Sequence, residues 1–316
     1  MPRVRPTFEL KVAGRKVRLG ERTLIMGVLN ATPDSFSDGG LYLAPDRAIQ
    51  HGMDLVREGA DWIDLGGEST RPGSLPVSAE EELRRVLPVI RGLRKKVPSV
   101  PISIDTTKAA VAEGALQAGA SIVNDISGLR FDARVADVAH RYGAPLVLMH
   151  LRGRPETMQR RPFAQDVWRS VFEGLETSIR RALAAGVRRS EIILDPGLGF
   201  GKSRRQNYAL LAGVERLRRF GLPILIGASR KSFVQAIVAG EGLDPARTGG
   251  RPKRYWPVRT KQVAVPPTKL MQLAMGDTAA VVAAILGGAH IVRAHDPGAI
   301  LPAVCVADAL LRCRGF

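Results

Sequence analysis

Short apolar runs alternate with longer amphipathic segments along most of the chain. Eight of the apolar runs are predicted to be strands: Leu24–Leu29, Trp62–Leu65, Ile102–Ile104, Ile122–Val123, Leu146–Leu148, Ile192–Leu194, Ile224–Ile226 and Ile291–Val292. The segments between them are predicted to be helices: Asp46–Glu58, Ala79–Lys95, Lys108–Ala118, Arg134–Arg141, Val167–Ala185, Gln206–Arg219, Ser232–Ala239 with Asp277–Leu286, and Ala299–Leu311. Short strands that are nearly all apolar are typical of a parallel sheet covered on both faces. Eight strand–helix units in roughly 250 residues predict a closed α/β barrel of the (β/α)8, or TIM-barrel, class.

Glycines mark the ends of several predicted helices. A Gly-Ala pair follows four of them, at Gly59-Ala60, Gly119-Ala120, Gly143-Ala144 and Gly288-Ala289, and glycine there supplies a left-handed cap. An open, doubly wound sheet is the alternative fold, but it usually has fewer strands, and no Gly-x-Gly-x-x-Gly fingerprint follows the first strand. Ahead of that strand, Phe8–Leu19 alternates apolar and polar residues around Ala13-Gly14. This alternation predicts an N-terminal β-hairpin, within residues 1–22, that closes the bottom of the barrel.

Length and composition fit one large domain over residues 1–316, although two ordinary domains would also fit the length. The two cysteines, Cys305 and Cys313, form no disulfide framework and fit a reducing compartment. No apolar run approaches the roughly 20 residues of a membrane helix, and the N-terminus lacks the apolar stretch of a signal peptide. We therefore expect a cytoplasmic protein that does not contact membranes.

The formal net charge is +17, with 47 Lys and Arg against 30 Asp and Glu. Such an excess can indicate nucleic acid, a membrane surface or an anionic substrate. The charge is spread over many helices, and no zinc-finger, aromatic RNA-binding or basic-heptad motif accompanies it, which argues against nucleic acid. One segment, residues 240–268, is rich in Arg, Lys and Pro and has no helical or strand period. We interpret it as a basic insertion in the helix 7 region, either solvated or in contact with a partner or an anion.

Polar residues follow every predicted strand, at the end where a barrel of this class collects its chemistry. They are Asn30, Gly66–Gly73, Asp105-Thr106, Asn124-Asp125, Met149-His150, Asp195–Gly197 with Phe200–Lys202, Ser229–Ser232, and Arg293 with His295-Asp296. A single polar residue at a strand end is usually a helix cap. Polar groups repeated at all eight ends, where burial without partners is costly, indicate a ligand rich in donors and acceptors.

These residues sort by the chemistry that each can recognise. Asp105, Asn124, Asp195 and Lys231 suit a flat, nitrogen-rich heterocycle, because carboxylates accept from ring N–H groups and lysine donates to a carbonyl. Arg71, Arg293 and His295 suit phosphate groups. Asn30 offers a neutral oxygen to a hard cation such as Mg²⁺ that is held mostly by substrate phosphates. The residues alone therefore predict a polar heterocycle that carries a phosphate or diphosphate.

The order of motifs closely resembles that of the dihydropteroate synthase family. The motifs that carry the resemblance are Asn30–Gly40, Gly67–Gly73, Ser103–Thr106, Val123–Ser127, His150 with Arg152-Gly153, Asp195–Phe200, Ser229–Ser232 and Arg293–Asp296. They run from about Leu24 to the C-terminus; each is weak alone, and together they are specific. The resemblance implies a (β/α)8-barrel enzyme of folate synthesis, a sulfonamide target, which joins 4-aminobenzoate to 6-hydroxymethyl-7,8-dihydropterin diphosphate and releases diphosphate.

The resemblance also implies a role for individual residues. Asp105, Asn124, Asp195 and Lys231 would hold the pterin, with Met149 and Phe200 lining its slot. Arg293 would cover the ring and, with His295, meet the diphosphate, while Asn30 would hold Mg²⁺. Thr70, Arg71 and Pro72 would close over the diphosphate and aminobenzoate, and Pro33, Phe36, Lys231 and Ser232 would form the aminobenzoate pocket. Asp38 is a candidate for stabilising the carbocation that remains when diphosphate leaves.

The chain departs from the family pattern in three places. Ala31 stands where a β-branched residue is more common, Leu151 stands where Met is common, and residues 240–268 replace a short link. The insertion leaves Ser229–Ser232 intact, so we expect activity. The family pairs through its later helices, so a homodimer is expected, although the insertion puts the geometry of that pairing in doubt.

Two other functions compete with a synthase. Methyltetrahydrofolate methyltransferases share an Asp/Asn/Asp pterin pocket, but they expel no diphosphate and would not need Ser69–Pro72 or Ser229–Ser232. A paralogue that binds pterin without turnover, or that uses its charge to hold nucleic acid, is the second. Every polar position of the family pattern is present, which argues against a loss of catalysis.

Overall fold

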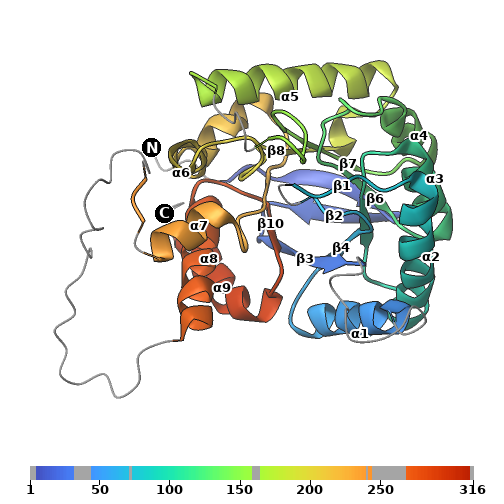
Figure 1. Cartoon of the computed structure of the whole chain (residues 1–316), viewed down its shortest axis with the longest axis horizontal. Coiled ribbons are helices and arrows are strands. Elements are labelled where there is room, and N and C mark those ends of the chain that lie inside the picture. The colour runs from blue at the N-terminus through green and yellow to red at the C-terminus, as the bar shows by residue number, and fades with distance from the viewer. Residues whose placement is uncertain are drawn as a thin grey trace.

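The computed structural model shows a parallel barrel surrounded by helices (Figure 1). It describes residues 5–31, 44–70, 73–158, 164–239, 241–243 and 268–313. The barrel strands are β3 (Leu24–Asn30), β4 (Trp62–Gly66), β5 (Ile102–Asp105), β6 (Ile122–Asp125), β7 (Leu146–Met149), β8 (Ile192–Asp195), β9 (Leu225–Ile226) and β10 (Ile291–Ala294). Most run one or two residues beyond the apolar run that predicted them, so that the first polar residue still belongs to the strand.

The strands pair in the order β8-β7-β6-β5-β4-β3-β10-β9, and every neighbouring pair is parallel. The two outer strands of this order meet through a parallel bridge between Leu194 and Ile224. Nearby, the backbone N–H of Leu194 donates to the carbonyl of Pro223 at 2.9 Å. The prediction of a (β/α)8 barrel is therefore confirmed.

Helices follow the strands as the amphipathic segments predicted. They are α1 (Ala44–Arg57), α2 (Ala79–Lys96), α3 (Ala109–Ala118), α4 (Arg134–Tyr142), α5 (Val167–Ala184), α6 (Arg204–Ala212), α7 (Ser232–Val238), α8 (Lys269–Leu286) and α9 (Pro297–Cys313). One prediction was wrong: the segment 206–219 is not one helix, because α6 ends at Ala212 and a 3-10 helix covers Val214–Phe220. Gly213 separates the two segments. A Cβ there would lie 2.7 Å from the ring of Trp168, so close packing requires glycine, which weakens a helix by about 1 kcal/mol relative to alanine.

The predicted hairpin closes the bottom of the barrel. Strands β1 (Phe8–Val12) and β2 (Arg15–Leu19) pair antiparallel around Ala13-Gly14, and they lie across the ring of strands in Figure 1. Their inward side chains, Leu10, Val12 and Leu19, are at most 1% exposed. They pack in one apolar cluster with residues such as Met26 and Trp62 from the barrel strands. The open end of the barrel is therefore the opposite one, where the strands finish.

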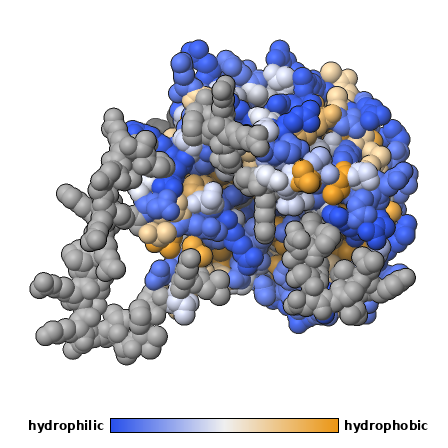
Figure 2. Space-filling view, in the orientation of Figure 1, coloured by the Kyte–Doolittle hydropathy of each residue, from blue (hydrophilic) through white to orange (hydrophobic). Residues whose placement is uncertain are grey.

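The predicted glycine caps are also present. Gly119 after α3 has φ 116° and Gly143 after α4 has φ 59°, both in the left-handed region. Most of the face drawn in Figure 2 is hydrophilic, as the high charge requires. No helix in the described part of the chain is long and apolar enough to cross a membrane. The insertion predicted at residues 240–268 lies outside the described residues except for 241–243 and Thr268.

Candidate functional site at the barrel mouth

The polar residues at the strand ends lie at neighbouring positions around the barrel mouth. The parallel register pairs Asn30 with Gly66, Gly66 with Asp105, and Asp105 with Asn124. Farther around the ring, Met149 pairs with Asp195. Since a parallel register keeps paired residues at one level, these side chains surround a single opening. Their roles toward a ligand stay a prediction.

An arginine joins two carboxylates across this opening. Nε of Arg293, from β10, lies 2.6 Å from Oδ2 of Asp64 in β4, and Nη2 lies 2.9 Å from Oδ2 of Asp105 in β5. Oδ2 of Asp64 also accepts a hydrogen bond from Nδ2 of Asn124 at 3.0 Å. The network links four of the eight strands, and it holds the guanidinium plane and the amide of Asn124 in fixed orientations.

Burial governs the charges of this network. The pKa of Asp105 is raised to about 7, first by burial and then by the negative charge of Asp64, against the attraction of Arg293. Burial disfavours the charged form of Arg293, but Asp64 and Asp105 outweigh this effect and raise its pKa. Two carboxylates thus face the one guanidinium of Arg293. Of these two, Asp64 is completely buried. Donors from a ligand would relieve the excess of acceptors.

Asp195 stands on the far side of the mouth, at the start of a glycine-rich loop. Its Oδ1 accepts from the backbone N–H of Gly197 at 2.7 Å. Its pKa is raised to about 6 by burial, against the effects of Gly197, Lys231 and Lys202. The pKa of this buried side chain therefore lies just below neutral pH, and its ionised form can accept hydrogen bonds from N–H groups.

Lys202 holds this loop through hydrogen bonds to its backbone carbonyls. Its Nζ, in a side chain only 4% exposed, donates to the carbonyls of His150, Gly197 and Phe200 at 3.1, 2.8 and 3.0 Å. Burial lowers the pKa of Lys202 to about 7, while three carbonyl acceptors match the three donors of an ammonium group. The lysine therefore ties the loop that carries Phe200 to the strand end that carries Met149.

Lys231 reaches the same opening from the N-cap of α7. Its Nζ lies 4.1 Å from the centroid of the Phe200 ring, which is a favourable cation–π distance. Burial lowers the pKa of Lys231 to about 8, and Arg293 acts in the same direction. Phe200 and Met149 belong to one apolar cluster. The carboxylates of Asp105 and Asp195 form a polar floor of the opening, and Met149 and Phe200 form an apolar wall beside it, with the ammonium group of Lys231 over Phe200. This combination of polar and apolar surface suits a flat heterocycle.

A second set of hydrogen bonds fixes the segment after β9. The carboxylate of Asp277, from α8, accepts from Oγ of Ser229 at 3.2 Å and from the backbone N–H of Arg230 at 2.7 Å. Oγ of Ser229 lies 3.3 Å from both the backbone N and Nδ1 of His295. His295 is therefore placed by Ser229, while Ser232 is exposed at the first position of α7.

A buried acid anchors the loop after β4. Nζ of Lys108 lies 2.6 Å from Oε2 of Glu82, which is completely buried, and also bonds Glu68. Glu68 begins the segment that contains Ser69 and Thr70, and Thr70 is half-buried. The base of this loop is thus held by a lysine between two carboxylates.

Some predicted site residues lie outside the described residues: Pro33, Phe36, Asp38, Arg71 and Pro72. Conversely, the structure reveals residues that sequence reasoning did not assign to the site: Asp64, Lys202, Glu82, Lys108 and Asp277. A signal for Asp64 exists, because an acid interrupts the apolar strand Trp62–Leu65. Lys202 follows a strand end in the sequence, but no motif there indicates its role, and the pairing of Glu82 with Lys108 joins segments that are far apart in the sequence.

Comparison with known proteins agrees with this geometry. The family model described as "Pterin binding enzyme" matches residues 26–295. The dihydropteroate synthase of Synechocystis sp. is 44% identical over 293 residues, which cover 93% of this chain and 92% of that relative. The solved structure of Xanthomonas albilineans dihydropteroate synthase with 4-aminobenzoic acid has TM-score 0.81 and 37% identity, covering 96% of this chain and 98% of that one. The Yersinia pestis dihydropteroate synthase in a sulfonamide drug complex has TM-score 0.80 and 38% identity, covering 96% and 99%.

Proposed function

The chain belongs to the dihydropteroate synthases of the pterin-binding enzyme family, and we propose that its barrel mouth joins 4-aminobenzoate to 6-hydroxymethyl-7,8-dihydropterin diphosphate, with release of diphosphate. The observation that carries the proposal is the set of Asp105, Asn124, Asp195 and Lys231 around one opening, in which Asn124 and Asp195 are buried and Asp105 and Lys231 are partly exposed. This set has the donors and acceptors that a reduced pterin ring presents.

The pterin ring lies between the polar floor and the apolar wall. The carboxylates of Asp105 and Asp195 accept from its ring N–H and amino groups, Asn124 both donates and accepts, and Lys231 donates to its carbonyl. Met149 and Phe200 contact its faces. Because hydrogen bonds and ion pairs already hold Asp105, Asn124 and Asp195, these side chains lose little entropy on binding.

We assign the diphosphate to the side of the mouth that carries Arg293 and His295. Expulsion of diphosphate is the difficult part of the reaction, since 4-aminobenzoate is a weak aryl amine that needs no strong protein base. Cationic groups stabilise the negative charge that grows on the leaving group. The electron-rich pterin supports the positive charge left on its methylene carbon, with Asp38 as a candidate for further stabilisation. The amine of aminobenzoate then attacks this carbon and loses its proton.

Residues on three loops complete the aminobenzoate side of the site. We assign Pro33, Phe36, Lys231 and Ser232 to the aminobenzoate pocket. Thr70, Arg71 and Pro72 belong to the loop that closes over the diphosphate and the aminobenzoate. The ion pairs of Lys108 with Glu68 and Glu82 support this assignment, because they hold the base of the loop.

The residues at the mouth fit a Mg²⁺ ion held largely by the substrate. An ideal Cβ on Gly66 would lie 3.8 Å from Oδ1 of Asn30 and 3.9 Å from Oδ2 of Asp105, so both oxygens face the space above Gly66. The described residues contain no cluster of three or more His, Cys, Asp or Glu that could hold a metal alone. Asn30 would supply one oxygen ligand, and oxygens of the diphosphate and of water would supply the others, as Mg²⁺ prefers. A bound Mg²⁺ ion would neutralise charge on the leaving diphosphate.

Exposed apolar residues on the last two helices support a homodimer. Met275 in α8 and Val306 in α9 are both 61% exposed, and Met271 and Leu310 are about half exposed. Large apolar side chains that project from packed neighbouring helices are typical of a subunit interface. Light scattering of the purified protein tests this assembly, and a monomer at micromolar concentration would contradict it. A cytoplasmic location stays a prediction from the two free cysteines.

Diphosphate release tests the proposed reaction directly. Purified protein is incubated with the dihydropterin diphosphate and Mg²⁺, with and without 4-aminobenzoate. We expect release that depends on aminobenzoate and yields 7,8-dihydropteroate, and inhibition by a sulfonamide in competition with aminobenzoate. Tight pterin binding without product would overturn the proposal in favour of a non-catalytic pterin binder.

A further inference from the structure

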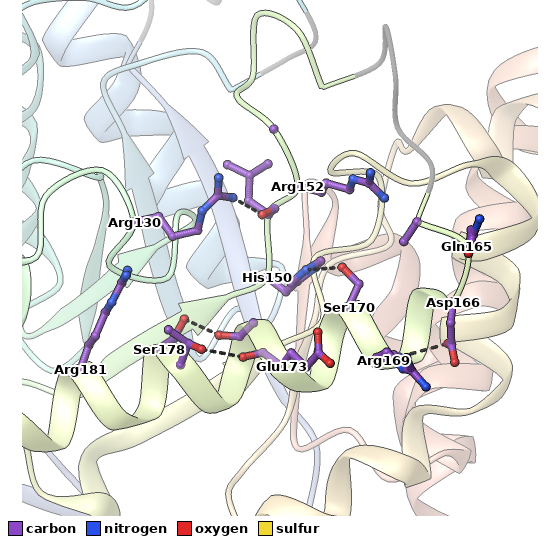
Figure 3. Close-up of a pocket in the computed structure, with 15 residues that line it drawn as sticks. Arg130, His150, Arg152, Gln165, Asp166, Arg169, Ser170, Glu173, Ser178 and Arg181 are labelled. Atoms are coloured by element: carbon purple, nitrogen blue, oxygen red, sulfur yellow. Dashed lines mark hydrogen bonds between the residues drawn. The ribbon is translucent and has the colours of Figure 1, made fainter.

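A cavity of about 680 Å³ lies between the β7–α5 connection and α5, outside the set of residues assigned to the reaction (Figure 3). Residues of the β6–α4 connection, the β7–α5 connection and one face of α5 line it. The volume is in the range of pockets that bind small metabolites. The cavity is therefore large enough for a ligand of its own.

Four arginines surround this cavity. Arg130 and Arg181 lie on one side of His150 in Figure 3, and Arg152 and Arg169 lie on the other. Arg130 and Arg181 donate to backbone carbonyls of Leu151 and Leu129. No ion pair to any of the four arginines is found in the described residues, whereas many other arginines of the protein pair with acids, as Arg22 does with Asp61.

Two carboxylates also line the cavity, and they leave an excess of positive charge. The carboxylate of Asp166 caps α5, accepting from the backbone N–H groups of Trp168 and Arg169 at 2.9 and 3.1 Å. Glu173 is exposed on the next turns of the helix. Four guanidinium groups against these two acids give the cavity a positive potential, which favours an anionic ligand.

The pKa values of His150 and Arg130 are lowered by burial and by the positive charges around the cavity. Burial and the charges of Lys202, Arg130 and Arg152 hold the pKa of His150 well below its ordinary value. Burial and the charges of Arg154 and Arg181 lower the pKa of Arg130. The His150 ring lies against Gly174, where a Cβ would be 2.5 Å from Cδ2, and its Nε2 lies 3.3 Å from Oγ of Ser170. A neutral histidine and a hydroxyl thus stand between the two pairs of arginines.

We propose that this cavity is a second binding site, for a small molecule with at least two anionic groups, of the phosphate-ester or polycarboxylate class. The planar guanidinium fork matches both phosphate and carboxylate oxygens. One arginine pair on each side of His150 suits a ligand with an anionic group at either end, and Ser170 supplies a hydroxyl beside His150.

The site shares a wall with the pterin slot. The backbone N–H of His150 donates to the carbonyl of Asp195 at 3.0 Å, and its carbonyl accepts from Lys202. Met149, the preceding residue, lines the slot. A ligand bound by Arg152 therefore contacts the segment that includes Met149 and is hydrogen-bonded to Asp195, and we expect it to change the pterin affinity.

The test measures anion binding rather than turnover, so it is independent of the proposed reaction. Inorganic phosphate and citrate are titrated separately by calorimetry into the wild type and into an Arg152→Gln, Arg169→Gln double variant. Neither side chain makes a hydrogen bond or ion pair with another described residue, so the variant should keep the fold. We expect the double variant to lose at least tenfold in affinity for one of the two anions. The anion affected identifies the site as one for phosphate esters or for polycarboxylates.

Arg91→Gln is the matched control, since Arg91 is exposed on α2 and lies outside the cavity. It removes one positive charge and should leave both titrations unchanged. A second titration is made with the dihydropterin diphosphate present, which removes anion binding at the barrel mouth. If the double variant then binds both anions as the wild type does, or if neither protein binds them, the proposal is wrong.

Discussion

Arg293 and Asp64 form an ion pair inside the barrel, with Nε of the arginine 2.6 Å from Oδ2 of the aspartate. Asp64 is completely buried, whereas the side chain of Arg293 is 18% exposed at the mouth. Asp64 therefore does not need to touch the pterin in order to matter, because it orients both Arg293 and Asn124. It is a positioning residue beneath the proposed pterin site.

Asp64→Asn should weaken both folding and pterin binding. The variant keeps the shape of the side chain but removes a charge from a buried pair, which costs about 3 kcal/mol of unfolding free energy. It also removes one of the charges that raise the pKa of Asp105. Urea unfolding measures the first effect and calorimetry with the pterin substrate the second.

Ser103→Ala is the control for this variant. Ser103 pairs with Asp64 in the strand register, and its buried Oγ has no hydrogen-bond partner in the described residues. Its removal should change the unfolding free energy by less than about 1 kcal/mol. Equal stability of Asp64→Asn and the wild type would show that the ion pair contributes nothing.

Pterin affinity should depend on pH through Asp195. Burial raises the pKa of this carboxyl to about 6, and the ionised form is the one that accepts from ring N–H groups. Binding then favours the carboxylate and releases a proton near pH 6. Affinity should fall as the pH drops below 6 and should level off above it. Asp105, whose pKa is about 7, adds a separate pH dependence near neutrality.

Calorimetry in buffers of different ionisation enthalpy measures the proton released on binding. Asp195→Asn should remove the release near pH 6 and weaken binding by about 2 kcal/mol, because an amide cannot accept at both positions. Affinity that instead rises as the pH falls would mean that the protonated carboxyl donates to the ring, and the assignment of Asp195 would be wrong.

The sequence predicted the barrel well because the signals were local. Apolar runs such as Ile192–Leu194 marked the strands, and glycines such as Gly119 marked the helix ends. The break at Gly213 was missed, because the amphipathic pattern continues through it and only the ring of Trp168 explains the glycine.

The candidate site shows the same limit. Side chains at strand ends, such as Asp105 and Asn124, could be gathered from the order of motifs alone. The acid that interrupts the strand Trp62–Leu65 marks Asp64 as unusual, but its partners Arg293 and Asn124 could not be predicted from the sequence. They depend on how far neighbouring strands are staggered around the barrel. The bonds of Lys202 to His150 cross from one loop to another, and no spacing in the sequence predicts them.

Lys108→Met should make stability depend on pH. Lys108 pairs with the buried Glu82, whose pKa burial already raises. Without the lysine, Glu82 holds its proton more tightly in the folded than in the unfolded state. Stability is then retained at low pH and lost as the pH rises through the raised pKa. We expect a loss of about 3 kcal/mol at pH 8 and a much smaller loss at pH 5.

Unfolding in urea at the two pH values checks this prediction. Adding Glu82→Gln to the Lys108→Met variant should abolish the extra dependence, because the group that titrates is gone. Turnover should also fall in Lys108→Met, since the loop of Ser69 and Thr70 loses its anchor. A pH dependence that persists in the double variant would assign the titration to another group.

Lys202→Met should separate pterin binding from the rest of the fold. The methionine fills a similar volume but removes the ammonium donor from the carbonyls of His150, Gly197 and Phe200, of which Gly197 keeps the backbone N–H of Phe200 at 3.2 Å. An unsatisfied buried acceptor costs roughly 1–3 kcal/mol, so the loop should shift away from the position in which Phe200 and Asp195 meet the ring. We expect the KM for the dihydropterin diphosphate to rise at least tenfold, with a smaller change in the KM for 4-aminobenzoate.

Lys11→Met, at an exposed position of β1, is the control and should change neither constant. If Lys202→Met raises both KM values equally, the lysine supports the barrel as a whole and does not position the pterin loop.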